Sequence, residues 1–297
     1  MRHAAVGCLI GLGGWLLLAA ALSTWLQRAH GVALVDTLGV SALAGLAAWA
    51  ALNLLHAAWQ AARERAAIAR GQAGRAPAHG KRGVLVGTLQ ALGGTLRAPL
   101  DGSECLAYDY RVTEDRGSGR RRMILTHARG SALAPSVIVT PGGRYRLLTV
   151  PDLQASPPTT PSTGHIAAFE RHARSTRFTT RADAAAQELV DRWTDDDGAY
   201  RADVCYTALD RLDLTRCVLT QQQVRPGAPV CVIGHFDQAR GGVVPSPPWA
   251  GNPRLIEGDP AALLRTLGGQ AVRRLLLGAA IALAALALVA AFVADRA

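Results

Sequence analysis

The sequence predicts an α+β membrane protein in which a mainly β domain with one or two short helices is flanked by three transmembrane α-helices. Hydrophobic residues make up 49% of the 297-residue chain, and three long apolar runs lie towards its ends. The region between them shows the period-two alternation of half-buried strands. We predict a two-helix hairpin (1–56), a basic juxtamembrane linker (57–82), a β-rich domain (83–264) and a final helical segment (265–297).

The clearest membrane span is the apolar run from Val32 to Leu55. Its 24 residues would rise about 36 Å as a helix, enough to cross a hydrocarbon core of about 30 Å. One ionisable residue, Asp36, lies in its first turn. Since that position is near the interface, we interpret Asp36 as a residue that reaches water and not as part of a proton relay.

Val6–Leu26 and Leu275–Val293 are the other two apolar runs. Small residues at Ala19–Ser23 give the first run a second interpretation, as a cleaved secretory signal. We favour an uncleaved span, because the run is longer than a usual signal core and only residues 27–31 separate it from the second run. The two runs are therefore expected to form a tight helical hairpin.

Basic residues border the second and third runs on the side of the middle domain. By the positive-inside rule, that domain lies in the cytoplasm and the protein is a multi-pass protein of the inner (cytoplasmic) cell membrane. Basic side chains beside an anionic bilayer are also candidates for contact with lipid headgroups. The candidate residues are Arg63, Arg65, Arg70, Arg75, Lys81, Arg82, Arg273 and Arg274.

The net charge of +10 does not indicate a nucleic-acid partner. Residues 83–264 carry 20 basic and 19 acidic side chains, so the excess lies beside the apolar runs. The expected partners are the lipid bilayer and a protein of unknown identity. Gly7 and Gly11 form one G-x-x-x-G pattern, which either occurs by chance or supports a homo-oligomer through the transmembrane helices.

The middle region is predicted to consist of strands joined by turns, after a Gly/Ala/Arg linker at 71–83. Cys105–Thr113 alternates apolar and polar residues, as a strand with one buried face does. Helical spacing predicts one helix over Arg181–Trp193, and another is expected to begin at Pro260 and continue into the third span. The other expected strands are Ser136–Thr140, Arg144–Val150, Ala202–Leu209, Arg216–Val224 and Pro229–Gly234.

Three segments also follow the pattern of a known family. Gly87–Val112 places a strand before the small-residue turn RAPLDGSEC and an aromatic strand, Val224–Gly234 forms a closing strand, and Arg254–Leu264 leads into the last span. This order resembles the GIDE domain, also called the beside-a-membrane domain, of MULAN-type E3 ubiquitin ligases and many prokaryotic membrane proteins. Gln222 and Gln223 depart from it, since a Glu is usual before the turn.

The resemblance implies a membrane-bound domain and, by analogy with the ligases, ubiquitin transfer. That activity belongs to a C-terminal RING finger, which holds two zinc ions with eight Cys/His ligands. Four residues follow Val293 in this sequence, and none is Cys or His. We therefore expect no ligase activity, no metal and no cofactor.

No catalytic residues are assigned. Cys105, Cys205, Cys217 and Cys231 are interpreted as buried hydrophobic residues, and a catalytic Cys105 would need a lowered pKa and a neighbouring base. His165 and His172 are seven residues apart on one helix, too far for one metal ion, and are interpreted as a solvated helix face.

Two charged clusters have ordinary structural interpretations. Asp195–Asp197 lacks the spacing of a calcium loop and is expected to be a turn after a helix. Arg120–Arg122 is either a charged hairpin tip or a contact with headgroups.

The sequence thus favours a membrane-anchored, non-enzymatic scaffold or sensor whose domain binds a protein partner or lipid headgroups. The alternatives are an E3 ubiquitin-ligase-like protein, a hydrolase that uses Cys105 or a histidine, and a transporter. Three spans with almost no polar residues disfavour a transporter.

Overall fold

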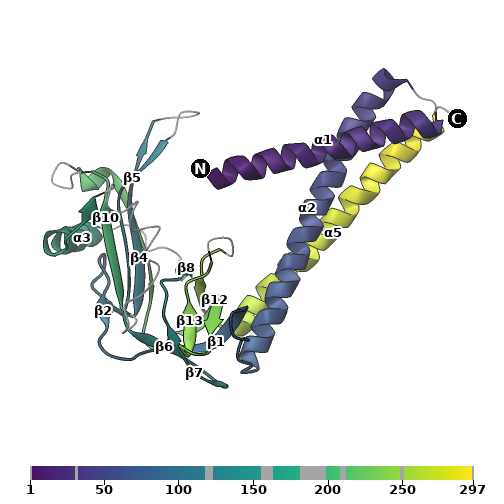
Figure 1. The fold of residues 1–297 in the computed structure, drawn as a ribbon. Coiled ribbons are helices and arrows are strands. Elements are labelled where there is room, and N and C mark those ends of the chain that lie inside the picture. Colours follow the sequence, from purple (N-terminus) through teal and green to yellow (C-terminus); the bar gives the residue numbers. More distant parts are fainter. Residues whose placement is uncertain are drawn as a thin grey trace. The chain divides into compact units, whose positions relative to one another are not determined.

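A computed structural model describes residues 2–30, 33–117, 123–154, 163–180, 199–207, 212–247 and 251–295. The chain divides into two compact units. The first comprises Met1–Ala66 with Leu264–Ala297 and is helical, and the second, Ala67–Leu263, contains the strands (Figure 1). This confirms an α+β protein with a mainly β domain.

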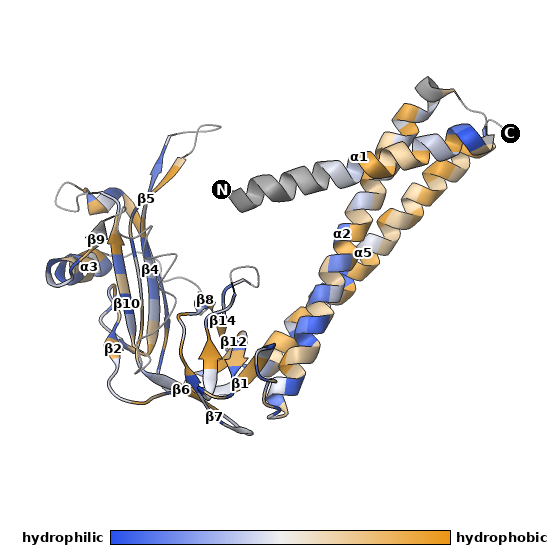
Figure 2. Cartoon of the chain, in the orientation of Figure 1, coloured by the Kyte–Doolittle hydropathy of each residue, from blue (hydrophilic) through white to orange (hydrophobic). Residues whose placement is uncertain are grey.

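Three long helices, α1 (Arg2–His30), α2 (Leu34–Gln72) and α5 (Pro260–Ala294), supply the helical unit. Thr37–Gln72 and Pro260–Ala294 are long and apolar enough to cross a membrane. Only 22% and 11% of their most apolar windows are buried, so these helices differ from the core helices of a soluble protein. Figure 2 shows apolar residues over one part of α2 and α5 and hydrophilic residues over the other.

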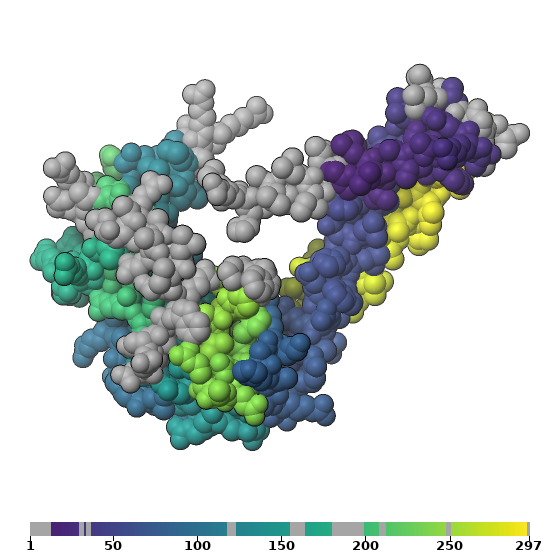
Figure 3. Space-filling model, viewed as in Figure 1, coloured from purple at the N-terminus to yellow at the C-terminus, as the bar shows by residue number. Residues whose placement is uncertain are grey.

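Close contacts show how the three helices pack against one another. α1 runs back across α2, since the Trp15 indole donates to the Ala42 carbonyl at 2.9 Å and the Ser23 and Thr37 hydroxyls are 3.0 Å apart. α5 lies alongside α2 (Figure 3), where a Cβ on Gly278 would be 3.3 Å from the Ala51 carbonyl oxygen. The small residue thus allows the two backbones to approach closely.

α2 extends well beyond the predicted span. It continues through residues 57–72, all of which were expected to form a linker. These residues are mainly Ala, Arg, Gln and Glu, which favour helix. The helix ends where Gly74 adopts a φ of 74° and Arg75 N donates to the Arg70 carbonyl at 3.3 Å, the pattern of a Schellman cap.

The larger sheet of the second unit contains seven strands. They are β1 (Arg82–Ala91), β6 (Ser136–Thr140), β7 (Gly143–Leu147), β8 (Asp152–Gln154), β12 (Pro229–Asp237), β13 (Gly242–Val244) and β14 (Arg254–Glu257).

Five of these strands close into a barrel. The order is β1-β6-β7-β13-β12, and β12 pairs back with β1. Only β7 and β13 are parallel among these five. In chain order this is first, second, third, fifth, fourth and first again, the arrangement of a Greek-key OB-type barrel. Leu89, Ile138, Val230 and Val232 are fully buried in its core.

The strands of a second sheet are inserted, along the sequence, between strands of the barrel. Its order is β11 (Cys217–Val224), β4 (Ala107–Arg116), β5 (Met123–Leu133), β10 (Tyr200–Cys205) and β9 (Thr179–Thr180). α3 (Thr163–Ser175) packs on one face through Phe169, which is 0% exposed. β2 (Leu96–Arg97) pairs with β3 (Glu104–Cys105), and the 3₁₀ helix η3 (Leu214–Arg216) precedes β11.

The structure confirms the strands predicted around β4, β6, β7, β10, β11 and β12 and the helix that begins at Pro260. The helix predicted over Arg181–Trp193, the turn at Asp195–Asp197 and the cluster Arg120–Arg122 lie outside the described residues. β5 and β13 were not predicted, because Gly, Ser and His interrupt the apolar alternation there.

Gly87→Ala should destabilise the barrel. Gly87 lies in β1 between β6 and β12, and a Cβ there would overlap the Val139 carbonyl oxygen. Crowding of this kind costs about 1–3 kcal/mol. Gly93→Ala is the control, since nothing lies within 4 Å of its added Cβ. Chemical denaturation of both variants should show a loss only for Gly87→Ala, and equal stabilities would contradict this packing.

Candidate functional site

The predicted basic residues separate into groups. Four of the eight, Arg70, Arg75, Lys81 and Arg82, line one pocket of about 330 Å³ in the second unit. Arg65 and Arg273 line a groove in the helical unit together with Arg265, which was not among the predicted residues. Arg63 stacks on an aromatic ring, and Arg274 lines neither cavity.

The pocket is built from the last turns of α2, the segment after it and the start of β1. Besides the four cationic residues its lining is Ala, Gly, Pro and Val, so no acidic side chain lines it. A Cβ on Gly71 would be 2.6 Å from the Val84 carbonyl oxygen, and one on Gly83 would overlap Pro77. Glycine at these two positions therefore allows the walls of the pocket to pack closely together.

The last part of the segment between α2 and β1, His79–Lys81, is hydrogen-bonded to the barrel. Gly80 N donates to the Phe236 carbonyl at 2.8 Å, and Phe236 N donates to the Lys81 carbonyl at 3.1 Å. The His79 ring accepts from Gln238 N at 3.2 Å. The sequence predicted a linker here, but the structure fixes it, and this positions the side chains of the pocket.

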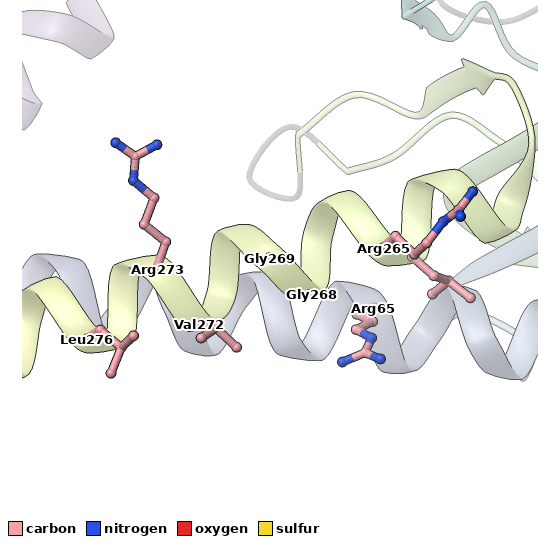
Figure 4. A pocket seen from close by; sticks show the side chains of 8 residues that line it. Arg65, Arg265, Gly268, Gly269, Val272, Arg273 and Leu276 are labelled. Carbon is pink, nitrogen blue, oxygen red and sulfur yellow. The ribbon is translucent and has the colours of Figure 1, made fainter.

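The groove between α2 and α5 has a different character (Figure 4). Arg65 lies against Gly268, where a Cβ would be 3.3 Å from the guanidinium carbon. Figure 4 shows Arg65 and Arg273 pointing in opposite directions from the helix pair, with Arg265 further along it. The three guanidinium groups do not converge, so one small anion cannot contact them all.

Aromatic and basic residues mark where the apolar part of α2 ends. Trp59 is 53% exposed, and the Arg63 guanidinium carbon lies 4.5 Å from the centre of its ring. Tryptophan is enriched at membrane interfaces, and arginine beside it stacks on the ring and reaches water. We therefore expect the membrane–water interface to lie at this Trp–Arg pair on α2.

The most buried charged side chain in the described part of the second sheet is Asp203 in β10, whose side chain is 2% exposed. The Tyr110 hydroxyl donates to it at 2.7 Å, Arg201 Nε donates at 2.9 Å, and His172 Nε2 lies 3.3 Å away. Burial opposes ionisation, but these hydrogen bonds outweigh it and lower the pKa of Asp203. Gly130 makes room for the carboxylate, since a Cβ there would overlap it.

The histidine pair on α3 was interpreted wrongly in part. Glu170 is exposed, as a solvated face requires, whereas His165 is half-buried. The His172 side chain is only 10% exposed and packs edge-on to Tyr110, with ring centres 5.5 Å apart. Its role is therefore to join α3 to the sheet through Asp203. The apolar residues around it, Ile166 and Phe169, were the available signal for a buried face.

Three of the four cysteines match their predicted role as buried residues. Cys105, Cys217 and Cys231 are buried, and Cys205 is half-buried. Burial, with a smaller contribution from Asp101, raises the pKa of the Cys105 thiol to about 12. A thiol of this kind is protonated at neutral pH and is a poor nucleophile.

Another histidine lies in a smaller polar group. His127 Nε2 is 3.0 Å from Glu114 Oε2, and its Nδ1 is 3.1 Å from the Thr207 hydroxyl. Within the described ranges, no three or more His, Cys, Asp or Glu side chains are placed to hold a metal ion. Comparison with protein-family models, with curated proteins and with solved structures gives no match.

Asp203→Asn should lower the free energy of unfolding by about 1.5–3 kcal/mol at pH 7, since hydrogen bonds to a charged group contribute about that much. Arg201 is half exposed, so Arg201→Gln should cost about 1 kcal/mol or less. The lowered pKa of Asp203 means that its contribution is complete above the ordinary value of 3.8 and is lost as the pH falls through the lower folded value.

Denaturation of the wild type and Asp203→Asn between pH 2 and pH 7 would measure this dependence. The stability difference between them should shrink below about pH 4. A difference that stays constant over this range would show that the ionised carboxylate does not stabilise the sheet.

Proposed function

We propose that this chain is a membrane-anchored scaffold or sensor of the GIDE type, whose β unit acts through binding and not through bond-making. The observation that carries the proposal is the sequence placement of a compact β unit between two helices that are long and apolar enough to span a membrane. Four basic residues from the last turns of α2, the segment after it and the start of β1 line a pocket within that β unit.

The proposed topology has three spans, with α1 as the first and the β unit on the cytoplasmic side of the cell membrane. The basic residues after the apolar part of α2 and before that of α5 support this orientation. Contacts of α1 with α2, such as Trp15 to Ala42, support α1 as part of the membrane anchor. An indole that donates to a helix carbonyl satisfies its polar group without water.

Lipid headgroups are the proposed partners of Arg63, Arg65, Arg273 and Arg274. Arg63 stacks on the exposed Trp59, and Arg273 and Arg274 directly precede the apolar run at Leu275. Because the guanidinium groups of Arg65 and Arg273 point apart, we assign them to general attraction by an anionic surface.

The polar groups of the β unit support binding over catalysis. The Cys105 thiol has a raised pKa. Asp203 is held by three side chains, and both ring nitrogens of His127 have partners. Groups that are satisfied in this way stabilise the fold, and each would have to break its bonds to act on a substrate.

Arg273→Gln with Arg274→Gln should weaken the retention of anionic lipid about thirtyfold, because each basic residue near an anionic surface contributes about 1 kcal/mol. The measurement is mass spectrometry of lipids that co-purify with the detergent-solubilised protein. Arg144→Gln with Arg171→Gln removes the same charge from exposed positions in the β unit. An equal loss in this control would contradict a headgroup role for Arg273 and Arg274.

A scaffold or sensor should hold its partners through the β unit. Cross-linking in cells, followed by purification in detergent, should recover partners with the full chain that are missing from the chain without residues 83–264. Identical partner profiles would reject the β unit as the binding element.

A further inference from the structure

We propose that the pocket lined by Arg70, Arg75, Lys81 and Arg82 is a binding site for a phosphate group, carried by a soluble phosphomonoester or by a lipid headgroup. This inference deepens the proposed sensor function and rests on it, since it names the chemical class of the ligand. The pocket volume of about 330 Å³ is at the lower end of the range for small-molecule sites, about 300–1,000 Å³.

The cap of α2 joins the backbones of two of these cationic residues. In a Schellman cap, the residue three positions before the end of the helix and the residue after the left-handed position come together, usually in an apolar contact. Here these residues are Arg70 and Arg75, on either side of the cap formed by Gly74. Like charges on neighbouring side chains repel, and an anion bound between them offsets that cost.

The C-terminus of a helix ordinarily disfavours an anion, and the cap weakens this effect. Free carbonyl groups at a helix C-terminus carry a partial negative charge of about half a unit. The Arg70 carbonyl accepts from Arg75 N, and the Gly71 carbonyl accepts from Gly74 N at 3.0 Å. With these carbonyl groups satisfied, four full positive charges outweigh what remains.

The remaining two cations are held by the barrel. Arg82 pairs with His235 in the ladder between β1 and β12, and the Lys81 backbone is bonded to Phe236. Gly74 is held against the β6–β7 turn, because a Cβ on Gly142 would overlap the Gly74 carbonyl oxygen. The backbone that carries the four side chains is therefore fixed before any ligand arrives, which lowers the entropic cost of binding.

One of the four cations, Arg82, also acts on a neighbouring histidine. Burial first, and then the charge of Arg82, lower the pKa of His235. Phosphate is favoured over a carboxylate as the ligand because its several oxygens can accept from guanidinium groups in pairs and from a lysine at the same time.

The experiment uses the full chain in nanodiscs of phosphatidylcholine, which carries no net charge. Titration calorimetry with inorganic phosphate and with glycerol 3-phosphate should show saturable binding at one site per chain. Arg75→Gln with Lys81→Gln should weaken it at least tenfold. The matched control, Arg144→Gln with Arg171→Gln, removes two exposed positive charges elsewhere in the same unit and should bind as the wild type does.

A second arm distinguishes the sources of the phosphate. Nanodiscs that contain phosphatidic acid should compete with glycerol 3-phosphate if the ligand is a headgroup, and should leave its binding unchanged if the ligand is soluble. The chemical shifts of the His235 ring report on site occupancy, since a bound anion offsets Arg82 and raises the pKa of His235.

Absence of saturable binding in both arms, or an equal loss in the matched control, would overturn the site. This result would leave the membrane anchor and the partner profile untouched, so it is distinguishable from failure of the proposed function. Conversely, Arg273→Gln with Arg274→Gln should not change phosphate binding, because neither residue lines this pocket.

Discussion

The attachment of the end of α2 to the barrel is the constraint from which the candidate site follows. After the Schellman cap at Gly74 the chain has seven residues before β1 begins at Arg82, and hydrogen bonds to Phe236 and Gln238 hold this short segment. Three glycines permit the approach, since a side chain at Gly71, Gly83 or Gly142 would meet backbone or proline atoms. The basic residues of the segment therefore have defined positions and cannot move as freely as those of a linker.

A different polar interaction holds the second sheet. Asp203 brings together a tyrosine from β4, an arginine from β10 itself and a histidine from α3. Removal of a carboxylate from water is costly unless its oxygens are satisfied, and this requirement selects one position of α3 on the sheet. Apolar contacts through Phe169 alone would tolerate small shifts of the helix, but the hydrogen bonds to Asp203 do not.

Local patterns predicted those parts of the fold that depend on neighbouring residues. The alternation in Cys105–Thr113 predicted β4, and the strands expected at Ser136–Thr140 and Arg144–Val150 correspond to β6 and β7. Closure of the barrel could not be predicted, because β1 pairs with residues about 145 positions later, and no local signal encodes that partner. The Gly/Ala/Arg composition of residues 71–83 predicted a linker, whereas its glycines allow close packing against distant strands.

The same distinction applies to the polar residues. The sequence showed eight basic residues beside apolar runs but not which of them share a pocket. Gln221 and Gln223 illustrate the point, since the Gln221 side chain accepts from Leu100 N at 2.8 Å and the Gln223 amide donates to Asp101 at 3.1 Å. These contacts join β11 to the small-residue turn, so glutamines at this place can be explained by packing of the turn. A glutamate at position 223 would instead face the Asp101 carboxylate, and like charges at that distance repel. The role of Gln223 thus depends on an aspartate more than a hundred residues earlier in the chain.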